Sequence, residues 1–260
     1  MAEQARSAVV RDGLRMAVGT LTALPVPAPT SIDRRVAGTA MAFAPLAGVV
    51  LAAAAGLVVG LGVLVGLPAL VVAVLGLGTV ALATRGLHLD GLADTADGLG
   101  ASYDRERALE IMRRGDAGPT GVATLLFVVL LQVGALAAAI SAGVGVVAIV
   151  VAVIASRVMV PLCCTRFVPS ARPEGLGATV SGAVAVPIAA GIAVAVAAVS
   201  TVALFAGLAW WQGPVAVVVG WCVAAVLLAR CIRRLGGMTG DVLGGCVEVS
   251  LAATLAILAV

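Results

Sequence analysis

Three aspartates in one short polar segment are the residues of this chain best suited to chemistry. Asp90, Asp94 and Asp97 lie in the stretch Gly86-Leu-His-Leu-Asp-Gly-Leu-Ala-Asp-Thr-Ala-Asp-Gly98. At about 100° per residue, a helix would project the three carboxylates within roughly 60° of one another. Crowded carboxylates repel each other unless protons or a cation neutralise them. Oxygen ligands suit a hard divalent ion such as Mg²⁺ or Mn²⁺, and such an ion suits phosphate chemistry.

The alternative for this cluster is a solvated helix whose carboxylates pair with nearby arginines. Surface ion pairs of that kind are common and contribute little to stability. A solvated helix, however, has no reason to gather its carboxylates on one narrow face beside Gly91. We therefore expect a metal site formed by the three aspartates. His88 is the only histidine, so a histidine-based metal cage is excluded.

A second acidic pair lies near the end of the chain, in Gly236-Gly-Met-Thr-Gly-Asp-Val-Leu-Gly-Gly-Cys-Val-Glu248. Asp241 and Glu248 are seven residues apart and so share a helix face. The alternative is a glycine-rich entry to a membrane helix with one stray carboxylate. A carboxylate inside an apolar span is costly unless it faces a polar cavity or partner. We therefore expect both acids to contact substrate or to complete a metal shell.

Arginines add candidate anion ligands, because guanidinium geometry matches phosphate oxygens. Arg113 follows the aspartate segment, and Arg172 lies beside Glu174 in the polar loop Pro169–Gly177. A surface loop would use such residues too, and taken alone the loop says little. The three residues are candidates for binding substrate. Arg157 lies within an apolar run, where phosphate binding and snorkelling to the membrane surface both remain open.

The composition predicts that membrane helices position these side chains. The hydrophobic fraction is 62%, and only 11% of residues are charged, which excludes an ordinary soluble domain. An apolar run of about 20 residues can cross a hydrocarbon core of about 30 Å as a helix. We predict an all-α, polytopic bundle of six to seven transmembrane helices, at about 38–60, 62–84, 118–140, 143–165, 182–207, 212–231 and 242–260.

The 16 basic residues are all arginines, and they cluster in alternate connections. The connections near 61, 141–142 and 208–211 carry no charge. By the positive-inside rule, the amino terminus and the polar loops face the cytoplasm. The active site is therefore expected at the cytoplasmic face.

We expect a single membrane-embedded catalytic domain over 1–260. Within it, 1–35 is predicted to be an amphipathic segment lying in the membrane interface. The polar segment 85–117 is predicted to form two helical stretches that carry the active site. The five cysteines form no Cys-x-x-Cys pair and are expected to be buried small residues.

Several of these motifs together resemble the cobalamin synthase family, the adenosylcobinamide-GDP ribazoletransferases. They are the aspartate motif Gly86–Leu99 and the shorter segments Leu109-Glu-Ile-Met112, Ala171-Arg-Pro-Glu-Gly-Leu-Gly177, Thr239-Gly-Asp-Val-Leu-Gly244, Leu21-Thr-Ala-Leu-Pro-Val-Pro27 and Phe43-Ala-Pro-Leu-Ala-Gly48. One departure is Arg113-Arg-Gly-Asp-Ala-Gly-Pro-Thr-Gly121, where the glycines match the family but the order of charges differs. No family role is therefore carried over to Arg114 or Asp116.

The resemblance implies a Mg²⁺-dependent transferase that completes cobalamin. The 3′-hydroxyl of α-ribazole, or of its 5′-phosphate, would attack the cobinamide-proximal phosphate of adenosylcobinamide-GDP and release GMP. Asp90, Asp94 and Asp97 would hold the ion. Asp97, Asp94 or His88 would take the hydroxyl proton, and Arg113 and Arg172 would bind the guanylyl phosphates. The expected partners are these small molecules and membrane lipid, not nucleic acid, with a homo-oligomer or a pathway complex left open.

Two other functions fit parts of the pattern. CDP-alcohol phosphotransferases also use an Asp-Gly-x-x-Ala motif followed by spaced aspartates. They place Arg after the Ala, however, whereas Asp94 follows Ala93 here. An ion-coupled transporter would place carboxylates near the bilayer midplane, whereas this cluster lies in a polar connection.

Overall fold

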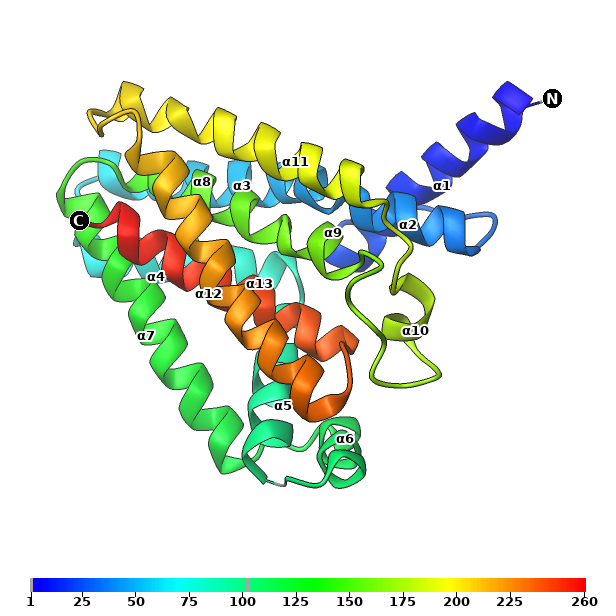
Figure 1. Cartoon of the computed structure of the whole chain (residues 1–260). Helices are drawn as coiled ribbons and strands as arrows, with labels where there is room; N and C mark the ends of the chain where they lie inside the picture. Colours follow the sequence, from blue (N-terminus) through cyan, green and yellow to red (C-terminus); the bar gives the residue numbers. More distant parts are fainter. Residues whose placement is uncertain (1, 102) are drawn as a thin grey trace.

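The computed structural model describes residues 2–101 and 103–260, and most of these residues are helical. The predicted segments 1–35 and 85–117 include Met1 and Ser102, which lie outside this description. No β-strand occurs in the described ranges, where a single bridge pairs Ser170 with Met238. The all-α prediction is confirmed. In chain order (Figure 1) the helices are α1 (Ala2–Leu21), α2 (Arg34–Ala42), α3 (Ala44–Leu64), α4 (Ala69–Ala83), α5 (Leu87–Ala101), α6 (Arg105–Arg114), α7 (Pro119–Ser141), α8 (Gly145–Arg157), α9 (Met159–Cys163), α10 (Leu176–Val180), α11 (Val186–Val199), the 3₁₀ helix η1 (Ser200–Ala206), α12 (Gln212–Leu235) and α13 (Gly240–Leu258).

Six helical segments are long and apolar enough to cross a membrane, which confirms a polytopic membrane protein. Each corresponds to one of the predicted spans. The α8–α9 and α11–η1 pairs each count as one continuous segment. The six segments are Ala44–Leu64, Pro119–Ser141, Gly145–Cys163, Val186–Ala206, Gln212–Leu235 and Gly240–Leu258.

The span predicted at 62–84 needs correction, because α4 has only 15 residues. At about 1.5 Å per residue it is shorter than a hydrocarbon core. Pro68 precedes its first residue, and Arg85 and Gly86 have positive φ angles just after its last. The chain then turns by 88° into α5, so α4 and α5 form at most one bent span.

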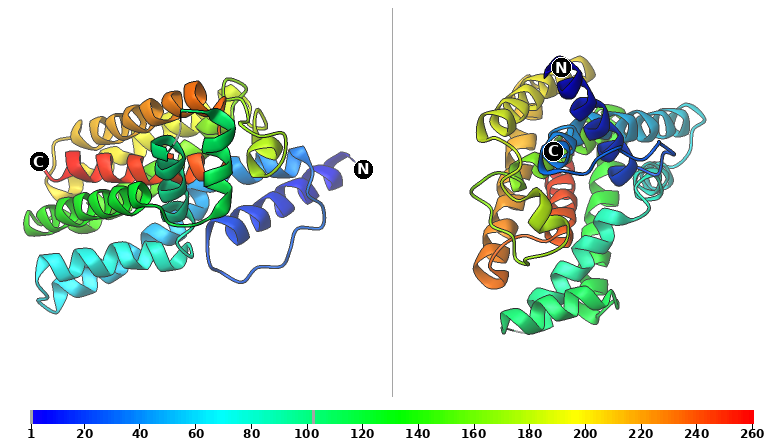
Figure 2. Two further views of the ribbon diagram at one scale, coloured as in Figure 1. Left: turned by 90° about the horizontal axis from the view of Figure 1, so that it is seen from below. Right: turned by 90° about the vertical axis from the view of Figure 1, so that its right-hand side faces the viewer.

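Helix α13 is the centre of the bundle. It packs against α12, α5, α8 and α7, and the left view of Figure 2 shows it between α12 and α7. Of its most apolar stretch, 72% is buried, compared with 17% for the α11–η1 segment. A central helix of this kind can hold polar groups away from lipid, and both late acidic residues lie on it.

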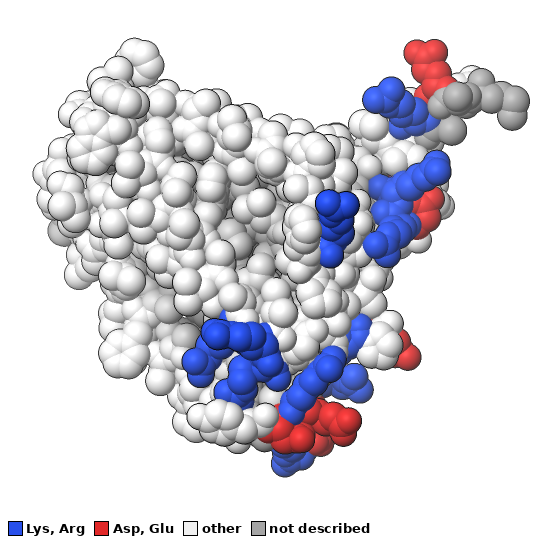
Figure 3. Space-filling model, viewed as in Figure 1, with Lys and Arg blue, Asp and Glu red and all other residues white. Residues whose placement is uncertain are grey.

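Charge is segregated to one part of the surface. The view in Figure 3 shows the arginine and acidic side chains at the end that carries α1, α6 and α10, while the opposite end is bare. Figure 2 shows the α3–α4 and α7–α8 connections at the bare end with the C-terminus. The structure therefore keeps the alternation of charged and uncharged connections that the sequence predicts.

The N-terminal segment forms α1 and then an extended stretch that leads to α2. Ala17 and Leu21 of α1 are buried with Met41 in the core, whereas Val10 and Leu14 remain exposed. Asp12 is buried and accepts a hydrogen bond from the Thr30 hydroxyl, which ties the extended stretch to α1. The location of this segment in the membrane interface stays a prediction.

Candidate active site

Helix α5 presents the aspartate motif at the charged end of the bundle. Its direction is set by the left-handed residues Arg85 and Gly86, which end α4 and start the turn. Asp90 is exposed on α5, whereas Asp94 is only 8% exposed. α5 lies outside the six apolar segments and packs against the first turns of α13 and α7.

Asp241 joins Asp90 and Asp94 because α5 and α13 touch at a glycine. A Cβ atom at Gly91 would lie 2.7 Å from the carbonyl oxygen of Asp241. Thr239 begins α13 by accepting a hydrogen bond from the Val242 backbone N–H at 3.2 Å. A cavity of about 240 Å³ lies here, and Asp90 and Asp241 both line it. The two acidic motifs therefore meet at one site.

The environment of Asp94 favours a proton or a cation. Burial raises the pKa of Asp94 to about 6, and the nearby carboxylates of Asp90, Asp241 and Asp97 add to the shift. The guanidinium of Arg172 acts in the opposite direction. Crowded negative charge in a partly buried site is what a bound divalent ion would relieve.

Asp97 is directed toward α7 instead of toward the other two aspartates. Its carboxylate accepts hydrogen bonds from the backbone N–H groups of Gly118 and Gly121, each at 2.8 Å. Asp97 therefore caps the N-terminus of α7, where helix N–H groups lack partners within the helix. Side chains at either glycine would collide with this carboxylate.

The predicted set of three metal-binding aspartates is consequently not assembled as such. Across 2–101 and 103–260, no three His, Cys, Asp or Glu side chains are grouped closely enough to hold a metal ion by themselves. The helix spacing correctly placed the three on one face. The amide donors at the start of α7 then decided where the Asp97 carboxylate points.

His88 lines the same cavity but is 1% exposed, and neither of its ring nitrogens has a hydrogen-bond partner within the described chain. Burial first, and the positive charge of Arg157 second, lower the pKa of His88 to about 3. A general base works best with a pKa near the operating pH. The ordinary pKa of histidine favoured His88 as the base, and this environment removes that advantage.

A second pocket, of about 460 Å³, lies between α6 and the loop that carries Arg172. Arg105, Arg113 and Arg172 all line it. Arg172 donates a hydrogen bond to the Leu109 carbonyl at 2.7 Å. The structure therefore brings Arg113 and Arg172 together as expected. Glu174 is exposed in the loop and does not line the pocket.

Arg105 is a pocket residue that the sequence did not single out. Its guanidinium donates to the Ala171 carbonyl at 3.0 Å and lies where a side chain at Gly236 would be. Figure 3 shows charged side chains of both signs gathered around this end of the molecule. No sequence signal pointed to Arg105, because the positive φ angle at the end of α12 already accounts for a glycine at 236.

The Arg172 loop is attached to the α12–α13 connection by backbone hydrogen bonds. The Ala171 N–H donates to the Met238 carbonyl at 2.9 Å, and the Met238 N–H donates to the Pro169 carbonyl at 2.8 Å. Asp241 lies in the first turn of α13, three residues after Met238. These backbone hydrogen bonds therefore fix the arginine-lined pocket relative to the acidic cluster.

Glu248 and Arg157 lie deeper in the bundle, away from Asp241. Glu248 is 4% exposed and accepts a hydrogen bond from the Gln132 amide at 2.8 Å. Arg157 is 1% exposed, packs across Gly48, and donates to the Ser156 hydroxyl at 2.8 Å. Neither snorkelling nor phosphate binding describes this buried arginine. The structure does not bring Glu248 to the cavity that contains Asp241.

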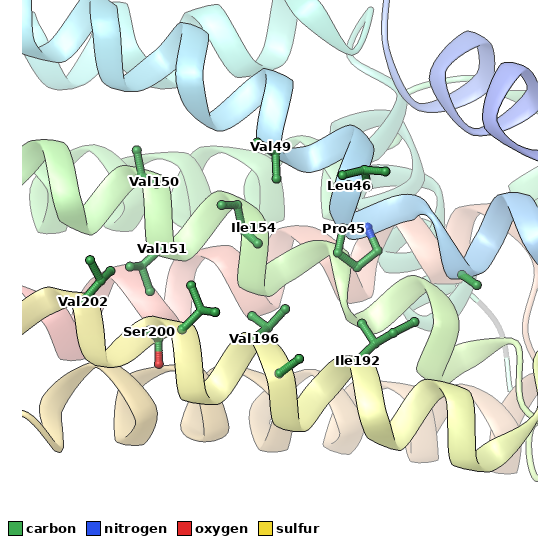
Figure 4. A pocket seen from close by; sticks show the side chains of 13 residues that line it. Pro45, Leu46, Val49, Val150, Val151, Ile154, Ile192, Val196, Ser200 and Val202 are labelled. Atoms are coloured by element: carbon green, nitrogen blue, oxygen red, sulfur yellow. The ribbon is translucent and has the colours of Figure 1, made fainter.

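An apolar groove between α3, α8 and α11 is separate from these polar sites. It has a volume of about 370 Å³ and is lined by aliphatic side chains such as Val49, Ile154 and Val196 (Figure 4). Its one hydroxyl, on Ser200, donates to the Ala197 carbonyl. No titratable group lines the groove, so it does not belong to the candidate active site.

Comparison with known proteins gives one consistent family. Residues 13–259 match the family described as cobalamin-5-phosphate synthase. A protein of Frankia casuarinae named adenosylcobinamide-GDP ribazoletransferase is 46% identical, over 94% of this chain and 93% of its own length. A Nocardioides protein of the same name is 44% identical, over 95% and 97%. No solved structure matches. The chain therefore belongs to the cobalamin-5-phosphate synthase family.

Proposed function

We propose that this protein is an adenosylcobinamide-GDP ribazoletransferase, which completes the nucleotide loop of adenosylcobalamin. The name comes from relatives that align over almost the whole chain. The observation that carries the proposal is the meeting of Asp90, Asp94 and Asp241 beside Arg172. A diphosphate substrate needs both features, a site for a divalent cation and guanidinium groups for the remaining phosphate charge.

The reaction exchanges one phosphate ester bond for another. The 3′-hydroxyl oxygen of α-ribazole, or of its 5′-phosphate, forms a bond to the cobinamide-proximal phosphorus. The bond from that phosphorus to the bridging oxygen breaks, and GMP leaves with the electron pair. The hydroxyl proton passes to a base on the enzyme. The product is adenosylcobalamin or its 5′-phosphate.

Asp94 is the proton acceptor that this arrangement favours, since its pKa of about 6 is close to neutral pH. Asp90 and Asp241 are the carboxylates that would hold Mg²⁺. Protein sites usually bind this ion through one or two carboxylates together with substrate phosphates. When bound there, Mg²⁺ neutralises charge on the phosphoryl oxygens. Arg113 and Arg172 line the pocket for the guanylyl phosphate.

The site faces the cytoplasm of a bacterial inner membrane in this proposal. The arginine-rich end of the bundle carries α5, α6 and the Arg172 loop, and the positive-inside rule places such an end in the cytoplasm. The same arginines favour anionic lipid head groups. The charged nucleotide substrate would then reach the site from the cytoplasm.

The deciding experiment incubates membranes that contain the protein with adenosylcobinamide-GDP, α-ribazole and Mg²⁺. GMP and adenosylcobalamin should appear in equal amounts. Asp94→Asn should abolish both products while the protein remains inserted. Full activity of this variant would remove the catalytic assignment. Release of CMP from a CDP-activated alcohol, with no GMP from adenosylcobinamide-GDP, would favour a phospholipid-synthesising enzyme instead.

A further inference from the structure

The arginine-lined pocket contains two carboxylates as well as its cations. Glu106 and Glu110, both on α6, line it together with Arg105, Arg113 and Arg172. A site that bound only phosphate would gain nothing from carboxylates, because they repel phosphate oxygens. A volume of about 460 Å³ also exceeds the needs of a single phosphate group. The pocket therefore has room and acceptor groups for more than the phosphate.

The two glutamates differ in what they already bind. Glu110 receives hydrogen bonds from Arg107 at 2.6 Å and from Arg114 at 2.7 Å, so its two oxygens are each engaged by a guanidinium. Glu106 makes no hydrogen bond or ion pair within the part of the chain that the structure describes. Both oxygens of Glu106 remain free to accept hydrogen bonds from a ligand.

We propose that Glu106 recognises the guanine base of the nucleotide substrate. Guanine presents two adjacent donors, the N1–H and the exocyclic N2 amino group, and an ionised carboxylate offers two acceptor oxygens to match them. Adenine presents an acceptor at N1, which a carboxylate repels. Arg105, Arg113 and Arg172 offset the negative charge of the phosphates and of the carboxylates in the pocket. The Glu106 carboxylate can therefore bind the base without repelling the substrate. This inference rests on the proposed function and assigns the specificity of the same site.

The pocket is connected to the reacting groups through Arg172. This arginine lines the pocket, and its charge also acts on Asp94 of the acidic cluster. A nucleotide whose base lies against Glu106 would thus extend its phosphates past Arg172 toward Asp94. Adenosylcobinamide-GDP has its groups in the same order, with the base at one end and the reacting phosphorus beyond the guanylyl phosphate.

The test compares adenosylcobinamide-GDP with its hypoxanthine counterpart, adenosylcobinamide-IDP. Hypoxanthine keeps the N1–H but lacks the N2 amino group, so one of the two proposed hydrogen bonds to Glu106 is lost. Hydrogen bonds to charged groups are worth enough to give wild-type protein about a tenfold higher kcat/KM for the GDP substrate. In Glu106→Gln the amide offers only one acceptor, and the preference should fall to about twofold or less.

The matched control is Glu110→Gln, which changes the other carboxylate of the pocket and should keep the tenfold preference. Glu106→Asp keeps the negative charge and should retain part of the preference for the GDP substrate. If Glu106→Gln is too slow to assay, equilibrium binding of GMP and IMP to the purified variant measures the same preference.

The two proposals fail in different ways. Wild-type protein that releases no GMP from adenosylcobinamide-GDP would overturn the proposed function. Wild-type activity together with an unchanged GDP preference in Glu106→Gln would overturn the role of Glu106 alone.

Discussion

Gly91 and Asp241 are in backbone contact, with room for only a hydrogen where another residue would carry a side chain. A Cβ atom at Gly91 would lie 2.7 Å from the Asp241 carbonyl oxygen and 3.0 Å from its Cα. Because these atoms belong to the main chain, they cannot move aside as a flexible side chain would. The contact brings the two acidic motifs together although they are far apart in the sequence.

Gly91→Ala should therefore separate α5 from α13 and impair the site. We expect at least a tenfold loss of kcat/KM, because small misplacements of reacting groups are costly. The thermal stability should fall as well. Gly134→Ala is the matched control, since a Cβ atom at Gly134 meets nothing within 4 Å. Equal activity of the two variants would contradict the importance of the contact.

Asp97 is expected to act as a helix cap. Asp97→Ala should destabilise the protein by about 1 kcal/mol, the usual cost of losing an N-cap side chain. Asp97→Asn retains one acceptor oxygen and should keep much of the activity and stability. Measuring the melting temperature in detergent and the kcat of both variants checks whether Asp97 acts as a cap. Complete inactivity of Asp97→Asn with unchanged stability would instead indicate a metal ligand or base.

Activity should depend on pH through Asp94. The pKa of Asp94 is raised to about 6 in the protein without bound ions, and the ionised form is the one that accepts a proton or attracts a cation. The value of kcat/KM should therefore be full above about pH 7 and fall about tenfold per unit well below pH 6.

Added Mg²⁺ should move this acid limb to lower pH, because a cation favours the ionised carboxylates. Measuring kcat/KM against pH at two Mg²⁺ concentrations checks both the limb and its shift. An acid limb that stays in place at all Mg²⁺ concentrations would argue against a cation beside Asp94.

The buried pair formed by Gln132 and Glu248 should matter for stability and not for substrate affinity. Gln132→Leu removes the amide that donates to the Glu248 carboxylate at 2.8 Å. The buried carboxylate then lacks this hydrogen bond. Hydrogen bonds to charged groups contribute about 1.5–3 kcal/mol, so the variant should unfold at a lower temperature.

Glu248→Gln keeps a hydrogen-bonding group at this position and should fold with an unchanged KM. Thermal unfolding and KM for both substrates separate the two roles. A large rise in KM for Glu248→Gln would return this residue to the substrate site.

Much of the architecture followed from patterns that the sequence makes visible. Long apolar runs predicted six of the membrane helices. Inside a bilayer the backbone N–H and C=O groups find no water to bond, and a helix that spans the core pairs them with one another. The arginines predicted which end would be charged. The span predicted at 62–84 was wrong at its start, since hydropathy does not register where one apolar helix ends and the next begins. Helix α3 continues to Leu64, and α4 starts only after Pro68.

Side-chain direction was decided by contacts between distant segments. Helical spacing determined from sequence alone that Asp90, Asp94 and Asp97 share a face, and the family motifs determined the reaction class to expect. Only the tertiary structure directed Asp97 to the amides of Gly118 and Gly121, and placed Asp241 beside Asp94. The reason is physical: the spacing of residues along a helix is a local property, whereas the partner of each carboxylate depends on which other backbone comes within hydrogen-bonding distance.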